Sequence, residues 1–173
     1  MLWNLFSQIP DSTCWYEQLH PNLLSHIQHV LPKQDHIGID DYWHNYRQLN
    51  NLADYHSHKF GQQNLFLEKD TRWTELSEYI NYLIQNSQTN TVVLQFNRMD
   101  LRLAWLKNNF PAAKIIHIHR QPRALWVSSR KHLPDLDKHF ESHPDAYDLM
   151  QWSADLVTLF PLLSPVKNRS SYY

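Results

Sequence analysis

The chain has 173 residues, of which 42% are hydrophobic and 19% charged, and its formal net charge is -1. This length suits one domain with a real core, and the composition excludes a disordered chain. The lone cysteine, Cys14, excludes an internal disulfide and is typical of a reducing compartment. There is no run of 18 apolar residues and no basic leader at the start, so we expect a cytoplasmic protein without a transmembrane segment.

The first half of the chain predicts one short strand among four helices. The hydrophobic spacing places these helices at residues 2–8, 21–31, 40–58 and about 70–86. Asp70 or Thr71 is expected to cap the last of them, because short polar side chains satisfy free N–H groups at a helix start. The strand is expected at 13–17 and ends at Glu17.

The second half alternates strands and helices. Residues 91–96 and 114–119 are apolar and rich in β-branched side chains, as buried parallel strands are. Between them, Asp100 is expected to cap a helix that stops near Pro111. Two further helices are expected, at residues 122–132 and 144–160. Strands and helices that alternate with short links predict a single α/β domain over 1–173, with ligands at the carboxyl ends of parallel strands.

The stretch that begins at residue 114 has the features of a phosphate site. The expected strand leads into Arg120, Pro122 suits the first turn of the next helix, and Ser128 follows Arg120 by eight residues. A helix start offers free N–H groups to an anion, and a guanidinium matches phosphate oxygens. Residues 101–134 contain seven Lys or Arg and no Asp or Glu, which indicates an anionic ligand more than a nucleic acid. A solvated helix after an ordinary core strand is the alternative.

Arg120 and Ser128 have the spacing found in the 3′-phosphate-binding segment of sulfotransferases that use 3′-phosphoadenosine-5′-phosphosulfate (PAPS). The chain resembles bacterial members of this family over most of residues 1–173, most specifically over 91–163. The upstream run Leu94-Gln95-Phe96-Asn97-Arg98-Met99-Asp100-Leu101-Arg102-Leu103-Ala104-Trp105-Leu106-Lys107 is part of the likeness. It continues in residues 109–114 and downstream in Tyr147, Trp152, 155–156 and 160–163.

The resemblance implies a P-loop-NTPase-like parallel sheet flanked by helices. It also implies transfer of a sulfuryl group from PAPS, without a metal, to a hydroxyl or amine of a small-molecule, glycan or lipid acceptor. Family members use a glutamate or a histidine as general base. Glu17, at a strand exit, is the first candidate for the base and His20 the second, although Glu17 also fits a salt-bridged or helix-capping residue. Arg98 is expected to contact the sulfuryl group or the acceptor, or else to pair with a carboxylate at the edge of the core.

The other motif of the family is missing from these residues. That motif is a loop rich in glycine and Ser/Thr that holds the 5′-phosphosulfate, whereas this chain has two glycines, Gly38 and Gly61, and no GxxxxGK[ST] pattern. Residues 1–6 resemble the helix that follows the loop. We therefore interpret the chain as a truncated member, incomplete at both ends, and expect little or no sulfotransferase activity from it.

Two other functions stay open at this point. One is a P-loop-type small-molecule kinase, which usually needs an Asp at a strand end to hold Mg²⁺; the expected strand ends here carry Asn97, Arg98 and Arg120. The other is a degenerate, non-catalytic nucleotide-binding remnant, which the missing loop favours.

The twelve histidines raise the question of a metal site. His117 and His119, like His56 and His58, have the His-x-His spacing that places two imidazoles on one face of a strand. No third and fourth ligands with convincing spacing accompany them. We therefore expect no metal, and we expect His117 and His119 to be hydrogen-bonded core residues.

Overall fold

The computed structural model describes residues 2–30 and 41–119, together with 121, 123, 124, 127, 158 and 159. The chain divides into two compact units, Met1–Pro111 and Ala112–Tyr173. All of the helices and strands whose bounds follow lie in the first unit. The expectation of one domain over 1–173 stays a prediction.

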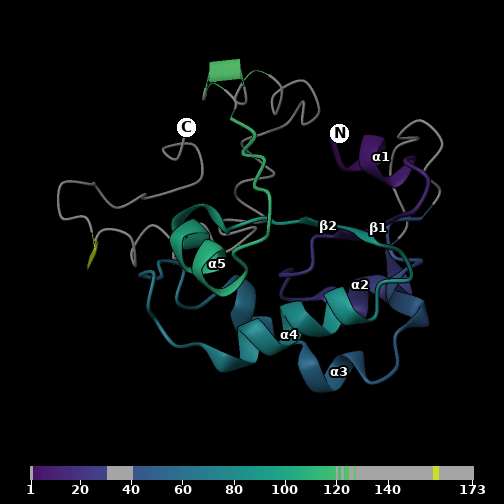
Figure 1. Ribbon diagram of the computed structural model, residues 1–173, viewed down its shortest axis with the longest axis horizontal. Helices are drawn as coiled ribbons and strands as arrows, with labels where there is room; N and C mark the ends of the chain where they lie inside the picture. The colour runs from purple at the N-terminus through teal and green to yellow at the C-terminus, as the bar shows by residue number, and fades with distance from the viewer. Residues whose placement is uncertain are drawn as a thin grey trace, which may run out of the picture. The chain divides into compact units, whose positions relative to one another are not determined.

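Two parallel strands form the sheet of the described residues. Strand β1, Ser12–Tyr16, pairs with β2, Thr91–Gln95, in a register that runs from Ser12 opposite Thr91 to Tyr16 opposite Gln95. In Figure 1 the two strands run side by side, with α1 on one side of them and α2, α3 and α4 on the other. The α/β class is therefore observed in its coarse form. Both strands lie within one residue of the predicted ranges, and β1 ends at Tyr16 rather than at Glu17.

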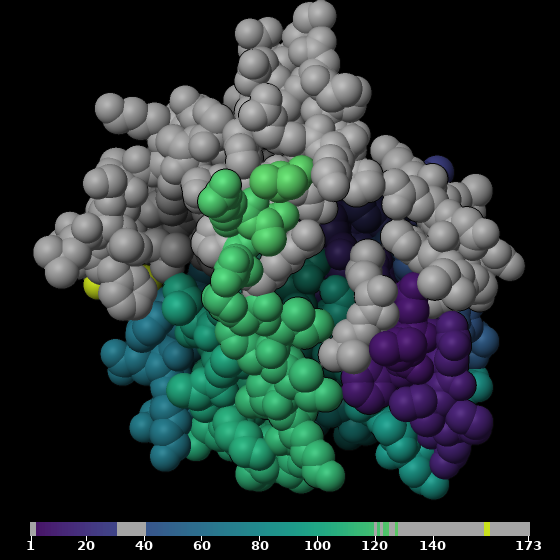
Figure 2. All heavy atoms as spheres, turned by 90° about the horizontal axis from the view of Figure 1, so that it is seen from above, coloured from purple at the N-terminus to yellow at the C-terminus, as the bar shows by residue number. Residues whose placement is uncertain are grey.

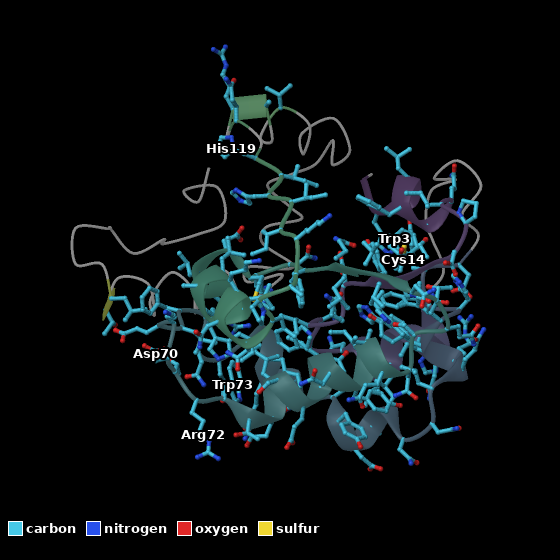
Figure 3. The ribbon with its side chains drawn as sticks, viewed as in Figure 1. Trp3, Cys14, Asp70, Arg72, Trp73 and His119 are labelled. Carbon is cyan, nitrogen blue, oxygen red and sulfur yellow. The ribbon has the colours of Figure 1, made fainter. Side chains whose placement is uncertain are left out.

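Helix α1, Leu2–Ser7, packs on the strands through one face only. Trp3 is buried and, as Figure 3 shows, lies beside Cys14 of β1, whereas Leu5 is 63% exposed. Figure 2 shows these N-terminal residues at the surface of the molecule. A helix so short depends on packing rather than on intrinsic propensity, so the Trp3 contact is what holds it.

Helix α4, Thr74–Gln85, supplies the largest apolar face below the sheet. Leu76, Tyr79, Ile80 and Leu83 are fully buried at the i, i+3, i+4, i+7 spacing, as the periodicity predicted. The predicted cap is wrong, because the helix begins at Thr74 and Trp73 occupies the N-cap position. Figure 3 shows that Trp73 points into the fold while Arg72 points away from it. Packing of the Trp73 indole therefore determines the residue at which the helix begins.

The single helix predicted over 40–58 is also wrong. The chain there forms a 3₁₀ turn at Tyr46–Gln48, helix α3 at Leu52–Tyr55 and a second 3₁₀ turn at His58–Gly61. Asn51 has φ 59°, a left-handed conformation that ends a right-handed helix and that Asn tolerates better than most residues. The sequence still has a helix-like spacing of apolar residues, because Trp43, Tyr46 and Leu52 are all buried even though no single helix joins them.

The segment 45–46 covers β1. Asn45 Nδ2 donates to Cys14 O at 3.0 Å, and Tyr46 Oη donates to Tyr16 O at 2.8 Å. Strand carbonyls left unpaired away from water are costly, and here two side chains satisfy them.

Helix α2, Leu23–His29, lies within the helix predicted at 21–31 and is shorter than it. Helix α5, Leu103–Asn109, is also observed, but it begins differently from the prediction. Asp100 does not cap α5 but begins a 3₁₀ turn, Asp100–Arg102, and Arg102 occupies the N-cap position of the helix. Trp105 of α5 is fully buried, and its Nε1 donates to Thr71 O at 3.0 Å. This bond ties α5 to the loop before α4.

The strand predicted at 114–119 is not observed. These residues have no strand assignment, and Ile115, Ile116 and Ile118 are 42%, 63% and 68% exposed. His117 and His119 are exposed as well, so their expected place in a core is wrong. The buried sheet that the apolar pattern predicted requires a neighbouring strand, and none is paired with this segment among the described residues.

The later elements lie largely outside the described residues. Arg123, Ala124 and Val127, from the helix predicted at 122–132, are helical, as are Thr158 and Leu159 from the helix predicted at 144–160. The P-loop-like arrangement of the sheet thus stays a prediction beyond its two described strands. In the part of the chain that the structure describes, no helix is both long and apolar enough to cross a membrane.

Candidate functional site

Glu17, His20 and Arg98 come from the carboxyl-terminal edge of the two strands. Tyr16 and Gln95 form the last residue pair of the sheet; Glu17 follows the first directly, and Arg98 comes three residues after the second. Because carboxyl ends of parallel strands meet at one edge, the two charged residues leave the sheet on the same side. The sequence predicted this shared edge for both residues.

Both residues have strained backbones. Glu17 has φ 44° and Arg98 has φ 62°, in the left-handed region that residues with a Cβ seldom occupy. Such conformations cost on the order of 1 kcal/mol each and persist only where the surroundings impose them, often at binding or catalytic sites. In this chain they turn the peptide sharply away from each strand.

Gln18 joins the two strand ends beneath the site. This side chain is fully buried, and its amide nitrogen donates to Trp15 O at 3.3 Å and to Gln95 O at 2.8 Å in the orientation that satisfies it. The carbonyl of Gln18 in turn accepts from Tyr79 Oη of α4 at 2.9 Å. The turn after β1 is therefore fixed both to β2 and to the helix below.

Gly61 connects the Glu17 turn to Arg98. A Cβ at position 61 would lie 2.3 Å from Leu19 O and 3.0 Å from the Pro21 ring, so only glycine allows this approach. Arg98 Nη1 donates to Gly61 O at 2.6 Å. The backbone of Gly61 thus touches the Glu17 turn and holds the Arg98 side chain.

His20 closes the turn that begins at Glu17. Its N–H donates to Glu17 O at 2.9 Å, and its Nδ1 accepts from Asn22 N at 3.0 Å. The His20 ring lies 4.1 Å from the ring of His26 in α2, centroid to centroid. His56 Nε2 meets His20 O at 3.2 Å. The second candidate base is thus held by its neighbours on both its ring and its backbone.

The charge of Glu17 acts on several groups around it. Burial lowers the pKa of His26, and the Glu17 carboxylate opposes that shift. Burial, and after it Glu17, raise the pKa of Tyr42. Tyr46, which is fully buried, has its pKa raised by burial, by Tyr79 and then by Glu17. The charge of Glu17 thus affects the pKa of one imidazole and two phenols, which come from different segments.

Aromatic rings pack around the same strand end. Tyr16 stacks on Tyr42 at 4.5 Å, and Trp3 meets both rings edge-on at 5.2 and 5.7 Å. Trp43 contacts Tyr16 at 5.4 Å and His26 at 6.0 Å. This cluster packs around Tyr16, the last residue of β1, which directly precedes Glu17.

Arg102 belongs to the core, although its charge was part of the basic stretch that indicated an anion. It is fully buried, and it donates to three carbonyls: Asn64 O at 2.9 Å, Phe60 O at 2.7 Å, and Gln63 O. Its guanidinium lies 5.3 Å from the centre of the Trp73 ring. Burial, with Arg98 as a second cause, lowers the pKa of Arg102 to about 10. Arg102 therefore organises the loop that carries Gly61.

Arg120 and Ser128 lie outside the described residues. The expectation that they face one crevice and hold the 3′-phosphate stays a prediction. In the ranges 2–30 and 41–119 and at the six further described positions, no three His, Cys, Asp or Glu side chains are grouped so that they could hold a metal ion.

Sequence reasoning did not single out Gln18, His26 or Gly61. Gly61 did carry a signal, because it is one of only two glycines in the chain. Gln18 and His26 carried none, since their contacts join segments that lie far apart in sequence or at no regular spacing.

Comparison with protein-family models, with curated protein sequences and with solved structures gives no match to this chain. The function is accordingly inferred from the residues of the site and from the motifs that resemble those of PAPS-dependent sulfotransferases.

Proposed function

We propose that this chain carries the acceptor side and the 3′-phosphate segment of a PAPS-dependent sulfotransferase. The reaction is transfer of a sulfuryl group from PAPS to a hydroxyl or amine. The observation that carries the proposal is the common edge of β1 and β2, where Glu17 and Arg98 leave in left-handed conformations and are connected through Gly61. Strain at both strand ends favours a site over a passive turn.

The chemistry requires few protein groups. An acceptor oxygen or nitrogen attacks sulfur in line, the bond from sulfur to the phosphate oxygen breaks, and adenosine 3′,5′-bisphosphate leaves. Positioning and charge stabilisation dominate such transfers, as they do for phosphoryl groups. Glu17 takes the proton of the acceptor, and Arg98 stabilises negative charge on the group in transfer.

Arg98 suits that role because one nitrogen of its guanidinium is held in place. Nη1 donates to Gly61 O at 2.6 Å, and this bond orients the guanidinium. The neighbouring Arg102 adds positive charge, and its three bonds to carbonyls keep it in place. A preorganised cation of this kind costs little reorganisation when charge develops.

Arg120 and Ser128 are proposed to bind the 3′-phosphate of the nucleotide, on the strength of the motif alone. Catalysis by these 173 residues is expected to be weak, since no glycine-rich phosphate loop is among them. Nucleotide binding is therefore the first property to measure.

The test is calorimetry of adenosine 3′,5′-bisphosphate binding to the 173-residue chain. We expect Arg120→Ala to weaken binding roughly 10- to 100-fold, as loss of a charge-assisted bond implies, and Ser128→Ala to weaken it less. Arg123→Ala is the matched control, because it removes the same charge three residues later. Equal affinities of the wild type, Arg120→Ala and Arg123→Ala would contradict the phosphate assignment.

A second assay separates catalysis from binding. Transfer from labelled PAPS is measured on hydroxyl and amine acceptors with the wild type and Glu17→Gln. Removing a general base costs about 10²- to 10⁴-fold in rate while nucleotide affinity stays the same. Equal transfer rates for the wild type and Glu17→Gln would contradict the assignment of Glu17 as the general base.

A further inference from the structure

The backbone carbonyls of the turn after β1 are held by hydrogen bonds from near and far along the chain. Glu17 O accepts from the His20 amide at 2.9 Å, and this bond closes the turn. Two side chains from distant segments reach the carbonyls that follow. Tyr79 Oη of α4 donates to Gln18 O at 2.9 Å, and His56 Nε2 meets His20 O at 3.2 Å. The turn that contains the proposed base is therefore fixed by the core as well as by its own residues.

The two side chains belong to an aromatic brace, which consists of His56, Phe60 and Tyr79. Phe60 and Tyr79 are buried and stack with their ring centroids 5.3 Å apart. The His56 ring meets both of them edge-on, at 6.1 Å from Phe60 and 5.5 Å from Tyr79. Side chains packed in this way hold one another in single rotamers. Tyr79 Oη thus reaches the turn from a rigid support.

The aromatic brace also continues into the loop that holds Arg98. Phe60 directly precedes Gly61, whose carbonyl accepts from Arg98 Nη1 at 2.6 Å. The carbonyl of Phe60 itself accepts from Arg102 Nη1 at 2.7 Å. One packed unit therefore supports the turn after β1 and the loop to which the proposed cation is bonded.

The bond from Tyr79 is the one closest to Glu17 that comes from outside the turn. Its acceptor, Gln18 O, belongs to the residue that directly follows Glu17. Gln18 is fully buried, so water does not reach this carbonyl to replace the phenol. Glu17 has φ 44°, and such a backbone persists only where its surroundings impose it. Loss of the phenol oxygen would therefore let the turn relax and move Glu17.

We propose that Tyr79 is the positioning residue of Glu17, which it holds in place through Gln18 O for the transfer of the acceptor's proton. This inference rests on the proposed function. Tyr79 acts through the backbone and takes no proton itself. Burial raises the pKa of Tyr79 well above its usual value, so the phenol remains a hydrogen-bond donor.

The test compares two variants of α4, Tyr79→Phe and Tyr82→Phe. Tyr82 lies three residues after Tyr79 in the same helix, is also buried, and donates its phenol to another backbone carbonyl, Asn50 O. Each variant loses one oxygen atom and one bond to a carbonyl but keeps its ring, so the packing of the core is retained. Only Tyr79→Phe removes a bond to the turn after β1.

Hydrogen exchange followed by NMR in the 173-residue chain measures the hold on the turn. The reporter is the His20 amide, and the Leu67 amide, which donates to Leu101 O at 3.1 Å, reports on the rest of the core. We expect Tyr79→Phe to accelerate exchange at His20 about 5- to 100-fold, as an unsatisfied buried carbonyl implies, and to change Leu67 less. Tyr82→Phe should leave this difference absent. Equal acceleration at both amides in Tyr79→Phe would overturn the proposal.

The transfer assay with labelled PAPS then separates positioning from stability. Tyr79→Phe should lower kcat roughly 10-fold, because a displaced catalytic group costs up to about 10²-fold, while the acceptor KM and the affinity for adenosine 3′,5′-bisphosphate stay the same. Tyr82→Phe should change none of these. Equal kcat values in the two variants would overturn the role of Tyr79 and leave the proposed function. Wild type without transfer, but with the expected exchange at His20, would overturn the proposed function and leave Tyr79 as the residue that holds the turn.

Discussion

Two apolar runs of this chain are alike in sequence and differ in structure. Thr91–Gln95 forms β2, paired along its length with β1, and Val92, Val93 and Leu94 pack against the core. The run 115–118, Ile-Ile-His-Ile, has no strand assignment, and its isoleucines are 42–68% exposed. β-Branched composition favours a strand in both, but only the first has a described neighbour that satisfies its backbone.

The difference shows that an apolar, β-branched segment forms a strand only where a neighbouring strand pairs with it. Isolated extended segments leave N–H and C=O groups to water and bury no side chain, so their apolar content gains nothing. Local sequence also fails to decide the burial of charged residues. Arg102 and Lys114 belong to one basic stretch, yet Arg102 is buried and Lys114 is exposed.

The largest expected effect on stability distinguishes Arg102 from Lys114. Arg102→Leu should lower the free energy of unfolding by about 3–5 kcal/mol, because three backbone carbonyls, including the buried one of Phe60, lose their donor. Lys114→Leu, at an exposed position, should change it by less than about 0.5 kcal/mol. Urea unfolding of both variants measures the difference. Equal midpoints for the two variants would mean that Arg102 is not a structural residue.

A smaller effect should separate the two apolar runs. Val93→Asp should cost about 2–4 kcal/mol, since a carboxylate would be placed against the core. Ile116→Asp should cost less than about 0.5 kcal/mol, because the side chain is already in water. Thermal unfolding followed by circular dichroism compares them. A large loss with Ile116→Asp would show that the run 115–118 is buried in solution and that the comparison fails.

The smallest effect concerns a histidine near the site. Burial lowers the pKa of His56 from 6.5 to about 4, against a bond to His20 O that raises it. Between these values the unfolded chain binds more protons, so stability rises from pH 4 to pH 6.5 and is lost as pH falls. We expect this slope to be worth about 1–2 kcal/mol, below the full linkage value because solvent partly screens the ring.

Unfolding midpoints of His56→Gln measured across that pH range test the slope. The variant should have a flatter pH profile than the wild type, while His119→Gln, which removes an exposed imidazole, is the control. An unchanged profile in His56→Gln would assign the slope to other groups.

Periodicity predicted the elements wherever burial follows a regular spacing. Helix α4 and strand β2 match, because Leu76, Ile80 and Leu83 repeat as a helix does and Thr91, Val92 and Val93 are β-branched. The predicted helix at 40–58 failed because Trp43 and Tyr46 are buried from irregular backbone, and Asn51 breaks the helix by its left-handed conformation. Aromatic residues at helical spacing therefore indicate that a segment is buried, but they do not show that its backbone is a helix.

The sequence by itself determined the α/β class and placed Glu17 and Arg98 at strand ends, since strand composition and order follow from local residue types. Only the tertiary structure decided what surrounds them. Gln18 joins the strand ends, Gly61 reaches both turns, and Asn22 fixes the tautomer of His20. Each of these depends on distances of about 3 Å between backbone and side-chain groups, and such distances are set by packing rather than by spacing along the chain.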